Sequence, residues 1–196
     1  GGSAYDTEMA QHVLVDPDGR IVVAGDTRSE DFPTTPGCHD DTYGGQRDSF
    51  ITVFNEDGSG LDYSSYVGGS GPDLINGILL HDGYPYLTGY TGSRDFPFSS
   101  GCYDNTVEGP GDCFVTRLSR EYDSYDYSTV VGGEDVDSGY GLVIDPDGNV
   151  HIAGKTGSRD FPTTPGCYDD SLQGGEDFFV CSLNPTLSDL RQSTFI

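Results

Sequence analysis

Short apolar runs separated by turn residues recur along the whole chain. An apolar run at 142–144 is followed by Asp-Pro-Asp-Gly at 145–148 and by a second run at 149–153. Pro, Asp and Gly between two apolar runs favour a tight turn, so this segment predicts a β-hairpin. The segment 13–24 has the same pattern, and 78–88 has it with a turn one residue shorter. No stretch sustains the 3.6-residue period of an amphipathic helix, so the pattern predicts strands and turns.

Two further apolar runs and a long loop rich in Gly, Pro, Ser and Asp follow each predicted hairpin. We expect third strands at 50–54, 114–118 and 178–183, and fourth strands at 61–67, 125–131 and 190–196. Each unit of the chain therefore holds four short strands, with the long loop between the second and the third.

The four-strand unit is repeated three times. Asp-Phe-Pro at 31–33 returns at 95–97 and 160–162, with offsets of 64 and 65 residues. The string YSSYVGG also returns as YSTVVGG, and its third copy, QSTFI, ends the chain where Gly-Gly is expected, while Gly-Gly begins the chain. A fixed period of this length indicates a repeat architecture. We therefore expect one continuous repeat domain made of the repeats 1–67, 68–131 and 132–196.

Four short antiparallel strands per period, with Gly and aromatic residues at fixed places, are typical of a β-propeller blade. We therefore expect an all-β fold of three four-stranded antiparallel, blade-like repeats. The strings YSTVVGG, GLVIDPDGNVHIAGKTGSRDFPTTPG and DFFVCSLN resemble the SBBP repeat, a β-propeller repeat of bacterial and archaeal secreted and surface proteins. The resemblance implies a non-catalytic module that is extracellular or on the cell surface, and it names no ligand.

Three blades do not close a propeller, because a ring has about four to eight of them and the outer faces of the end blades need cover. We expect copies of the same chain to cover these faces and to build a larger propeller, an array or a filament. The residues expected at this contact lie at the chain ends and are Gly1, Gly2, Leu190, Ser193, Thr194, Phe195 and Ile196. Two other interpretations stay open: an excised part of a larger surface propeller, or a carbohydrate- or protein-binding propeller of the adhesin or lectin kind.

The net charge of the chain limits the classes of partner that it can bind. With 33 acidic and 9 basic side chains the formal net charge is −24, which excludes nucleic-acid binders and proteins that bind anionic membrane surfaces, since both need clustered Lys and Arg. No apolar run approaches the 18 or so residues of a membrane span. Besides copies of the chain, a glycan or a surface protein is a candidate partner. The five cysteines are compatible with an oxidising, extracellular setting.

Aspartates stay in register between the repeats, in four columns: Asp6/Asp73/Asp137, Asp31/Asp95/Asp160, Asp40/Asp104/Asp169 and Asp48/Asp112/Asp177. Carboxylates in Gly-rich loops are ligands of Ca²⁺, which takes six to eight oxygens. Asp6, Asp73, Asp135 and Asp137 are the candidate ligands, and Ca²⁺ is the candidate cofactor. The alternative is that these aspartates cap backbone N–H groups in turns.

The positions of the cysteines allow one candidate disulfide. Cys38, Cys102 and Cys167 share a loop position, whereas Cys113 and Cys181 occupy third-strand positions of opposite parity, on opposite sides of the sheet. The pairs Cys102–Cys113 and Cys167–Cys181 therefore cannot share one geometry, and Cys102 with Cys113 is the candidate bridge. Cys38 has no partner cysteine in its repeat and is the candidate free or intermolecular thiol.

Catalysis finds little support in the sequence. The four histidines occupy unrelated places in the period, and nucleophile-elbow, zinc-protease and phosphate-loop motifs do not occur. We therefore expect a protein that is not an enzyme. The recurring aromatic residues predict core packing, and an exposed loop tyrosine with polar neighbours would favour the carbohydrate-binding alternative.

Overall fold

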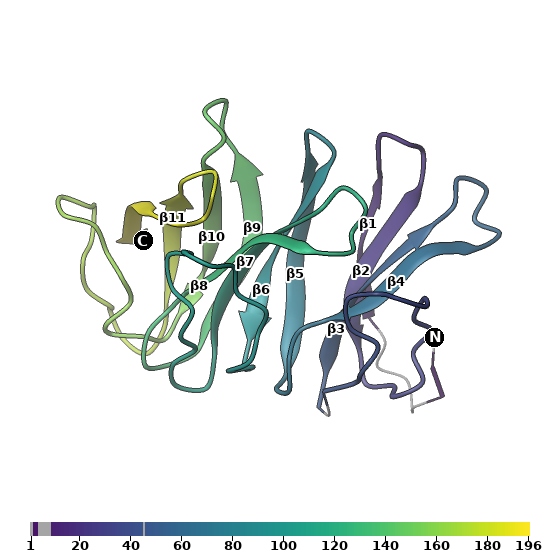
Figure 1. Ribbon diagram of the computed structural model, residues 1–196. Helices are drawn as coiled ribbons and strands as arrows, with labels where there is room; N and C mark the ends of the chain where they lie inside the picture. Colours follow the sequence, from purple (N-terminus) through teal and green to yellow (C-terminus); the bar gives the residue numbers. More distant parts are fainter. Residues whose placement is uncertain (1, 4–8, 45) are drawn as a thin grey trace.

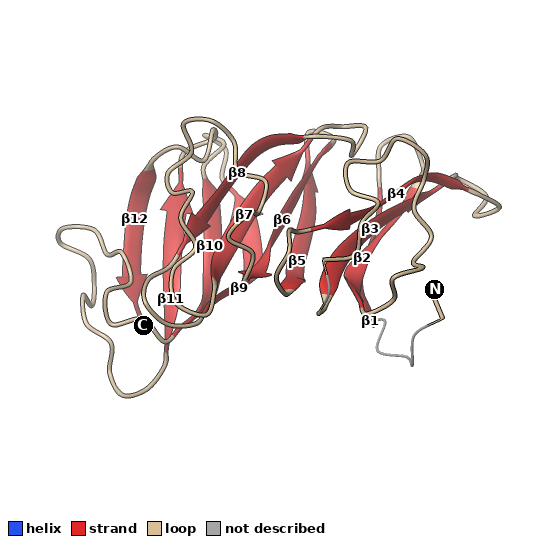
Figure 2. Cartoon of the chain, turned by 60° about the horizontal axis from the view of Figure 1, so that its bottom comes forward, coloured by secondary structure: helices blue, strands red, loops and turns tan. Residues whose placement is uncertain are grey.

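The computed structural model of the chain describes residues 2–3, 9–44 and 46–196. They form three four-stranded antiparallel sheets that follow one another in chain order (Figure 1). Strands and loops make up this part of the chain, with no helix among the described residues (Figure 2). The expected all-β fold of three four-stranded antiparallel repeats is therefore confirmed. Accordingly, the described residues include no helix long and apolar enough to cross a membrane.

Each sheet, called a blade below, takes all its strands from one predicted repeat. Blade 1 consists of β1 (Met9–Val15), β2 (Ile21–Thr27), β3 (Asp48–Phe54) and β4 (Leu61–Val67). Blade 2 consists of β5 (Asp73–His81), β6 (Tyr84–Thr91), β7 (Asp112–Leu118) and β8 (Tyr125–Val131). Blade 3 consists of β9 (Asp137–Ile144), β10 (Val150–Thr156), β11 (Asp177–Leu183) and β12 (Leu190–Phe195).

The predicted hairpin turns form as their residues dictate. Between β9 and β10, Oδ1 of Asp145 accepts the backbone N–H groups of Asp147 and Asn149, each at 2.9 Å. The shorter turn between β5 and β6 has Asp82 and Gly83 at φ values of 52° and 78°, the left-handed pair that a two-residue Asp-Gly hairpin turn requires. This turn accounts for the two different offsets of the repeat.

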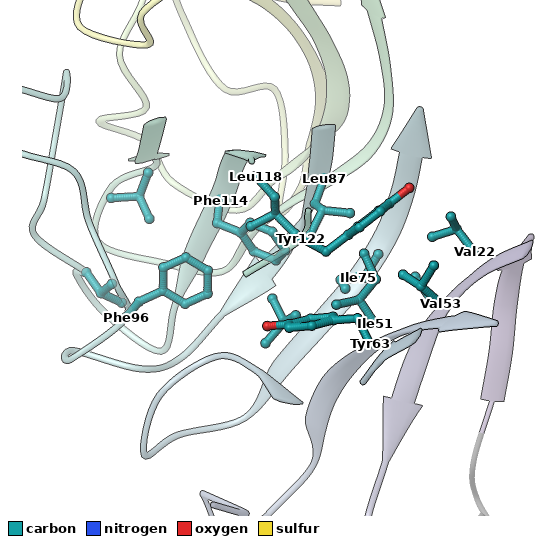
Figure 3. Packing of buried hydrophobic residues seen from close by; sticks show 14 residues of the cluster. Val22, Ile51, Val53, Tyr63, Ile75, Leu87, Phe96, Phe114, Leu118 and Tyr122 are labelled. Atoms are coloured by element: carbon teal, nitrogen blue, oxygen red, sulfur yellow. The ribbon is translucent and has the colours of Figure 1, made fainter. Parts of the chain in front are cut away.

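The blades stack face to face. Because successive residues of a strand point to opposite sides of a sheet, each blade has an N-side face, toward the preceding blade, and a C-side face, toward the following one. In junction 1–2, Val22 and Ile51 of blade 1 meet Leu87 and Phe114 of blade 2 (Figure 3). In junction 2–3, C-side residues of blade 2 pack in the same way on N-side residues of blade 3: Tyr86, Cys113 and Val115 on Ile152 and Phe179.

Candidate functional site

The C-side face of blade 3 carries a cluster of apolar side chains beside His151 and Lys155, and no blade of the chain lies against it. Strand alternation places on this face side chains that are exposed by a third to two thirds: Tyr140, Val143, Phe178, Val180 and Ile196. Tyr140, Phe178, Val180 and Ile196 line a shallow groove together with Ala153. Large apolar side chains gathered on one face mark an interaction surface.

Equivalent residues are covered in the other two blades. By its place in the repeat and in the strand pairing, Val143 is equivalent to Leu14 of blade 1 and to Leu79 of blade 2. Val143 is 63% exposed, whereas both leucines pack against a junction core. The same contrast holds for Val180, whose buried equivalents are Ile51 and Val115. Blade 3 therefore carries a junction surface without the neighbouring blade.

The N-side face of blade 1 is the second open face. Val13 and Val15 are each 66% exposed. Val13 is equivalent to Ile78 of blade 2 and to Leu142 of blade 3. Ile78 packs against junction 1–2, and Leu142 packs against junction 2–3. Beside these valines, described residues of blade 1 line an apolar groove: Ala10, Val23, Phe32, Pro33, Phe50, Thr52, Phe54 and Leu61.

A larger groove lies on the C-side face of blade 3, between the long loop and the outer strand. It is lined by His151, by residues 164–168 and 180–182, and by residues 190–194. Tyr168, at its rim, is 87% exposed and would favour the carbohydrate-binding alternative. Its equivalent Tyr103, however, packs against junction 2–3, where its backbone N–H donates to Leu187 O at 2.9 Å. The exposure of Tyr168 therefore follows from the uncovered face of blade 3.

The residues expected at an assembly contact are placed differently by the fold. Ser193 and Phe195 are buried, and Phe195 packs on Phe161 on the N-side face of blade 3. Ser193 and Thr194 bind the long loop of their own blade: the Ser193 N–H donates to Thr164 Oγ1, and the Asp169 N–H donates to Thr194 Oγ1, each at 3.0 Å. Ser193 and Thr194 also line the larger groove, so their place in an assembly contact stays a prediction. Phe195, which packs inside the chain, is corrected to an internal role.

Of the other assembly residues, Leu190 is partly buried against junction 2–3, and Ile196 lies on the open C-side face. Gly2 is packed beside Ser29 and Asp31, and Gly1 lies outside the described residues. The prediction missed Val13, Val143, Phe178 and Val180. The signal for Val13, Val143 and Val180 was present in the repeat itself, because each of these positions is apolar in every blade, whereas Phe178 has Ser49 as its equivalent in blade 1.

The aspartate columns cap backbone N–H groups, as the turn interpretation expects. Asp31, Asp95 and Asp160 accept from the N–H groups of Ser3, Ser70 and Glu134. Asp40, Asp104 and Asp169 accept from Thr42, Thr106 and Ser171. Asp48, Asp112 and Asp177 accept from Gly44, Glu108 and Gln173. The Asp40 and Asp48 columns therefore each cap the same local turn in all three blades, whereas the Asp31 column joins its loop to a segment 25 to 28 residues earlier in the chain.

Two of the columns also meet in the blade junctions. A Cβ on Gly132 would lie 2.4 Å from Asp112 Oδ1 and 2.7 Å from Asp137 Oδ2, so the carboxylates of blades 2 and 3 converge on one glycine. Asp48 and Asp73 make the corresponding pair at junction 1–2, where the charge of Asp73 acts on Asp48. All four side chains are buried, and the Oδ1 atom of each has no hydrogen-bond partner among the described residues.

Burial dominates the electrostatics of these pairs. It raises the pKa of Asp48 and Asp112 to about 7, and the charge of the facing aspartate adds to the rise. It also raises the pKa of Asp73 and Asp137 to about 6, although hydrogen bonds such as those from Ser93 and Ser158 stabilise their charged forms. Two facing buried carboxylates disfavour each other's ionisation, so a pair tends to retain a proton near neutral pH.

The candidate calcium ligands do not come together. Asp73 and Asp137 lie in different junctions, Asp135 caps the N–H of Val136 at its own exposed turn, and Asp6 lies outside the described residues. The described part of the chain has no group of three or more His, Cys, Asp or Glu side chains placed to hold a metal. A carboxylate pair alone falls short of the six to eight oxygens of Ca²⁺, so calcium binding stays a prediction.

All five cysteines lie within the described residues and are free thiols, which corrects the candidate bridge. The Cys102 thiol donates to Asp104 O in the long loop, whereas Cys113 is buried on the C-side face of blade 2, beside Thr88. As predicted, Cys113 and Cys181 lie on opposite faces of their sheets. Cys113 faces blade 3 and Cys181 faces blade 2, so both thiols lie in junction 2–3.

A comparison with protein families matches residues 126–162 to SBBP, a β-propeller repeat. The matched segment runs from β8 across junction 2–3 through β9 and β10 to Pro162. The resemblance seen in the sequence is confirmed over this segment. No match to the chain was found among curated proteins.

Proposed function

We propose that this chain, which carries an SBBP β-propeller repeat, is a non-catalytic structural module that stacks its open blade faces onto copies of itself. The product is a larger propeller, an array or a filament. The observation that carries the proposal is the exposure of Val143, whose equivalents Leu14 and Leu79 pack in junctions of the same chain. A face that already packs twice within the chain is suited to pack a third time.

The two open faces are of the two types that pack together in the junctions of the chain. Junctions 1–2 and 2–3 each join a C-side face to an N-side face, and the open faces are one of each. A contact between copies would therefore be heterologous, and such a contact either closes into a ring or continues as a filament.

Charge opposes this contact, because each copy carries a net charge of −24. Salt screens the repulsion between exposed charges over a Debye length of about 8 Å at physiological ionic strength. Self-association driven by apolar faces should therefore strengthen as salt is added. A contact held by ion pairs would weaken instead.

We further propose an extracellular or cell-surface location and no catalytic role. The location is supported by the SBBP match, with the acidity of the chain as a compatible feature. The absence of a catalytic role is supported by the SBBP match, because this family is a structural repeat.

The test is the solution mass of the chain by light scattering over a range of concentrations, at low and at high salt. We expect multiples of 21.0 kDa whose population grows with concentration and with salt. Val143→Lys should shift the distribution toward the single chain. Thr106→Lys, with the same added charge on an exposed long-loop residue of blade 2, serves as the control and should leave the distribution unchanged.

A single chain at every concentration and salt would overturn self-assembly. Equal effects of the two lysine variants would show that association does not use the C-side face of blade 3.

A further inference from the structure

The turn between the third and fourth strands of each blade holds one residue in the left-handed conformation. These residues are Gly58 at φ 69°, Tyr122 at φ 68° and Leu187 at φ 54°. Equivalent backbone hydrogen bonds close the three turns, from these residues to Asn55, Ser119 and Asn184. Glycine adopts this conformation freely, but tyrosine and leucine adopt it only where the surroundings hold them.

Tyr122 inserts into blade 1, where its surroundings hold it. It is 2% exposed and packs in junction 1–2 with Val22 and Ile51; Figure 3 shows it reaching toward Val22. Its hydroxyl donates to Asp16 Oδ2 at 3.2 Å, and the Arg20 guanidinium lies 5.3 Å from its ring centre.

Leu187 makes the same insertion into blade 2. It is fully buried in junction 2–3 with Tyr86 and Val115, and its carbonyl accepts the Tyr103 N–H. Each of these turns therefore places one large side chain, the plug, in a socket on the C-side face of the preceding blade.

Blade 3 carries the next socket. The larger groove on its C-side face is lined by His151, Val180 and Tyr168. By strand register and repeat position they are equivalent to the residues around Leu187 in blade 2, namely Tyr86, Val115 and Tyr103. This continuity with two occupied sockets of the same chain indicates what the groove accepts.

Blade 1 has no large side chain at the plug position. Gly58 stands at the plug position, and a Cβ built there would meet no atom within 4 Å. A second copy that stacks blade 1 on blade 3 would therefore bury backbone and leave the socket without a large side chain.

We propose that the groove of blade 3 is a socket for the turn of another blade that carries a large apolar residue at the left-handed position, and that Gly58 makes the contact between copies weak. The inference rests on the proposed stacking of open faces and adds the determinant of its specificity. Val180 and Tyr168 are the residues that would contact the plug.

The experiment adds the plug to the chain. Gly58→Leu should strengthen self-association by about tenfold or more in sedimentation velocity, because association then buries a leucine side chain. Gly58→Ala is the matched control, since it brings the same left-handed strain without a plug and should associate as the parent chain does. Gly58→Tyr is a second plug, with Tyr122 as its precedent.

Val180→Arg combined with Gly58→Leu should abolish the gain, because the charge occupies the socket. Thermal unfolding of each variant shows that it is folded, and a plug variant that unfolds is replaced by the other.

The outcomes separate this inference from the proposed function. Association of the parent chain without a gain in either plug variant overturns the plug and leaves stacking in place. Association of the plug variants alone supports the plug and overturns stacking of unmodified copies. Association of neither overturns both.

Discussion

The Tyr122 hydroxyl donates a hydrogen bond to Oδ2 of Asp16 across 3.2 Å, and this bond joins a turn of blade 2 to the first hairpin of blade 1. Asp16 also accepts from Arg20 Nε at 2.7 Å. Burial works against the charged form of Asp16, but the hydrogen bond and charge of Arg20 outweigh it and lower the pKa of the carboxyl. The charged acceptor strengthens a bond between blades.

Tyr122→Phe should therefore lower the free energy of unfolding by about 1–2 kcal/mol, because it removes a hydrogen bond to a charged acceptor and keeps the ring. Urea unfolding at pH 7 measures the loss. Tyr168→Phe, which removes a hydroxyl from a residue 87% exposed, should change stability by less than about 0.5 kcal/mol. Equal losses in the two variants would contradict the role of the bond.

The stabilisation by Asp16 should also depend on pH. Because the pKa of Asp16 is lowered in the folded state, its contribution is present above the unfolded value of 3.8 and is lost as the pH falls through the folded pKa. The loss caused by Tyr122→Phe should shrink at acidic pH. A loss that is independent of pH would show that the bond does not favour the charged carboxylate.

The junction aspartates should have the opposite pH dependence. The pKa of Asp112 is raised to about 7, so the folded state binds a proton more strongly than the unfolded state between pH 4 and 7. The stabilisation is full below about pH 4 and declines as the pH rises to about 7. Asp112→Asn keeps the acceptor and removes the buried charge, so it should stabilise the chain at pH 8 by about 1–3 kcal/mol and have little effect at pH 5.

Asp177→Asn is the control for that measurement, because Asp177 is the equivalent residue of blade 3 and is only partly buried. It should leave the pH profile of thermal unfolding unchanged. A chain destabilised at pH 8 by Asp112→Asn, and stabilised there by added Ca²⁺, would show instead that the pair holds a cation.

Thiol reactivity should divide the cysteines into two classes. Burial raises the thiol pKa of Cys113 to about 12 and that of Cys181 well above its usual value, and a buried protonated thiol is a poor nucleophile. Cys38, Cys102 and Cys167 are partly exposed. Iodoacetamide at pH 8 should modify these three thiols in the native chain and all five after unfolding, as read by mass spectrometry. Equal rates for all five would contradict the burial of the junction thiols.

Gly154 should tolerate no side chain. A Cβ at this position would lie 2.2 Å from Ser138 O and 2.4 Å from Phe179 Cζ. Gly154→Ala should therefore destabilise the chain by about 1–3 kcal/mol through overpacking. Gly141→Ala is the control in the same sheet, since nothing lies within 4 Å of its Cβ, and should have an effect within about 0.5 kcal/mol in chemical denaturation.

Much of the fold could be predicted from local signals. Asp-Pro-Asp-Gly turns and alternating apolar residues act over a few residues, so strands such as β9 and β10 can be read from their own segment. The same signals, repeated three times, predicted the three sheets. The turn-capping aspartates were also predictable, because an Asx turn needs only its own loop.

The candidate site was less accessible to sequence reasoning. The chain ends were expected to form the contact, but Phe195 is equivalent to Tyr66 and Val130, and all three pack on the N-side faces of their own blades. Comparison of apolar positions between repeats could have found Val143, because Leu14 and Leu79 share its place. The socket could not be found this way, since its lining comes from both the long loop and the outer strand.

The sequence by itself determined the strands, their number per repeat and the threefold period, because turn chemistry and side-chain alternation are local properties of the chain. Only the tertiary structure decided which side of each sheet meets which neighbour. That choice places Asp112 against Asp137, brings Cys113 and Cys181 into one junction and seats Tyr122 in blade 1. It is a non-local outcome, since burial of an apolar face depends on the blade that covers it, and Val143 remains exposed where no blade does.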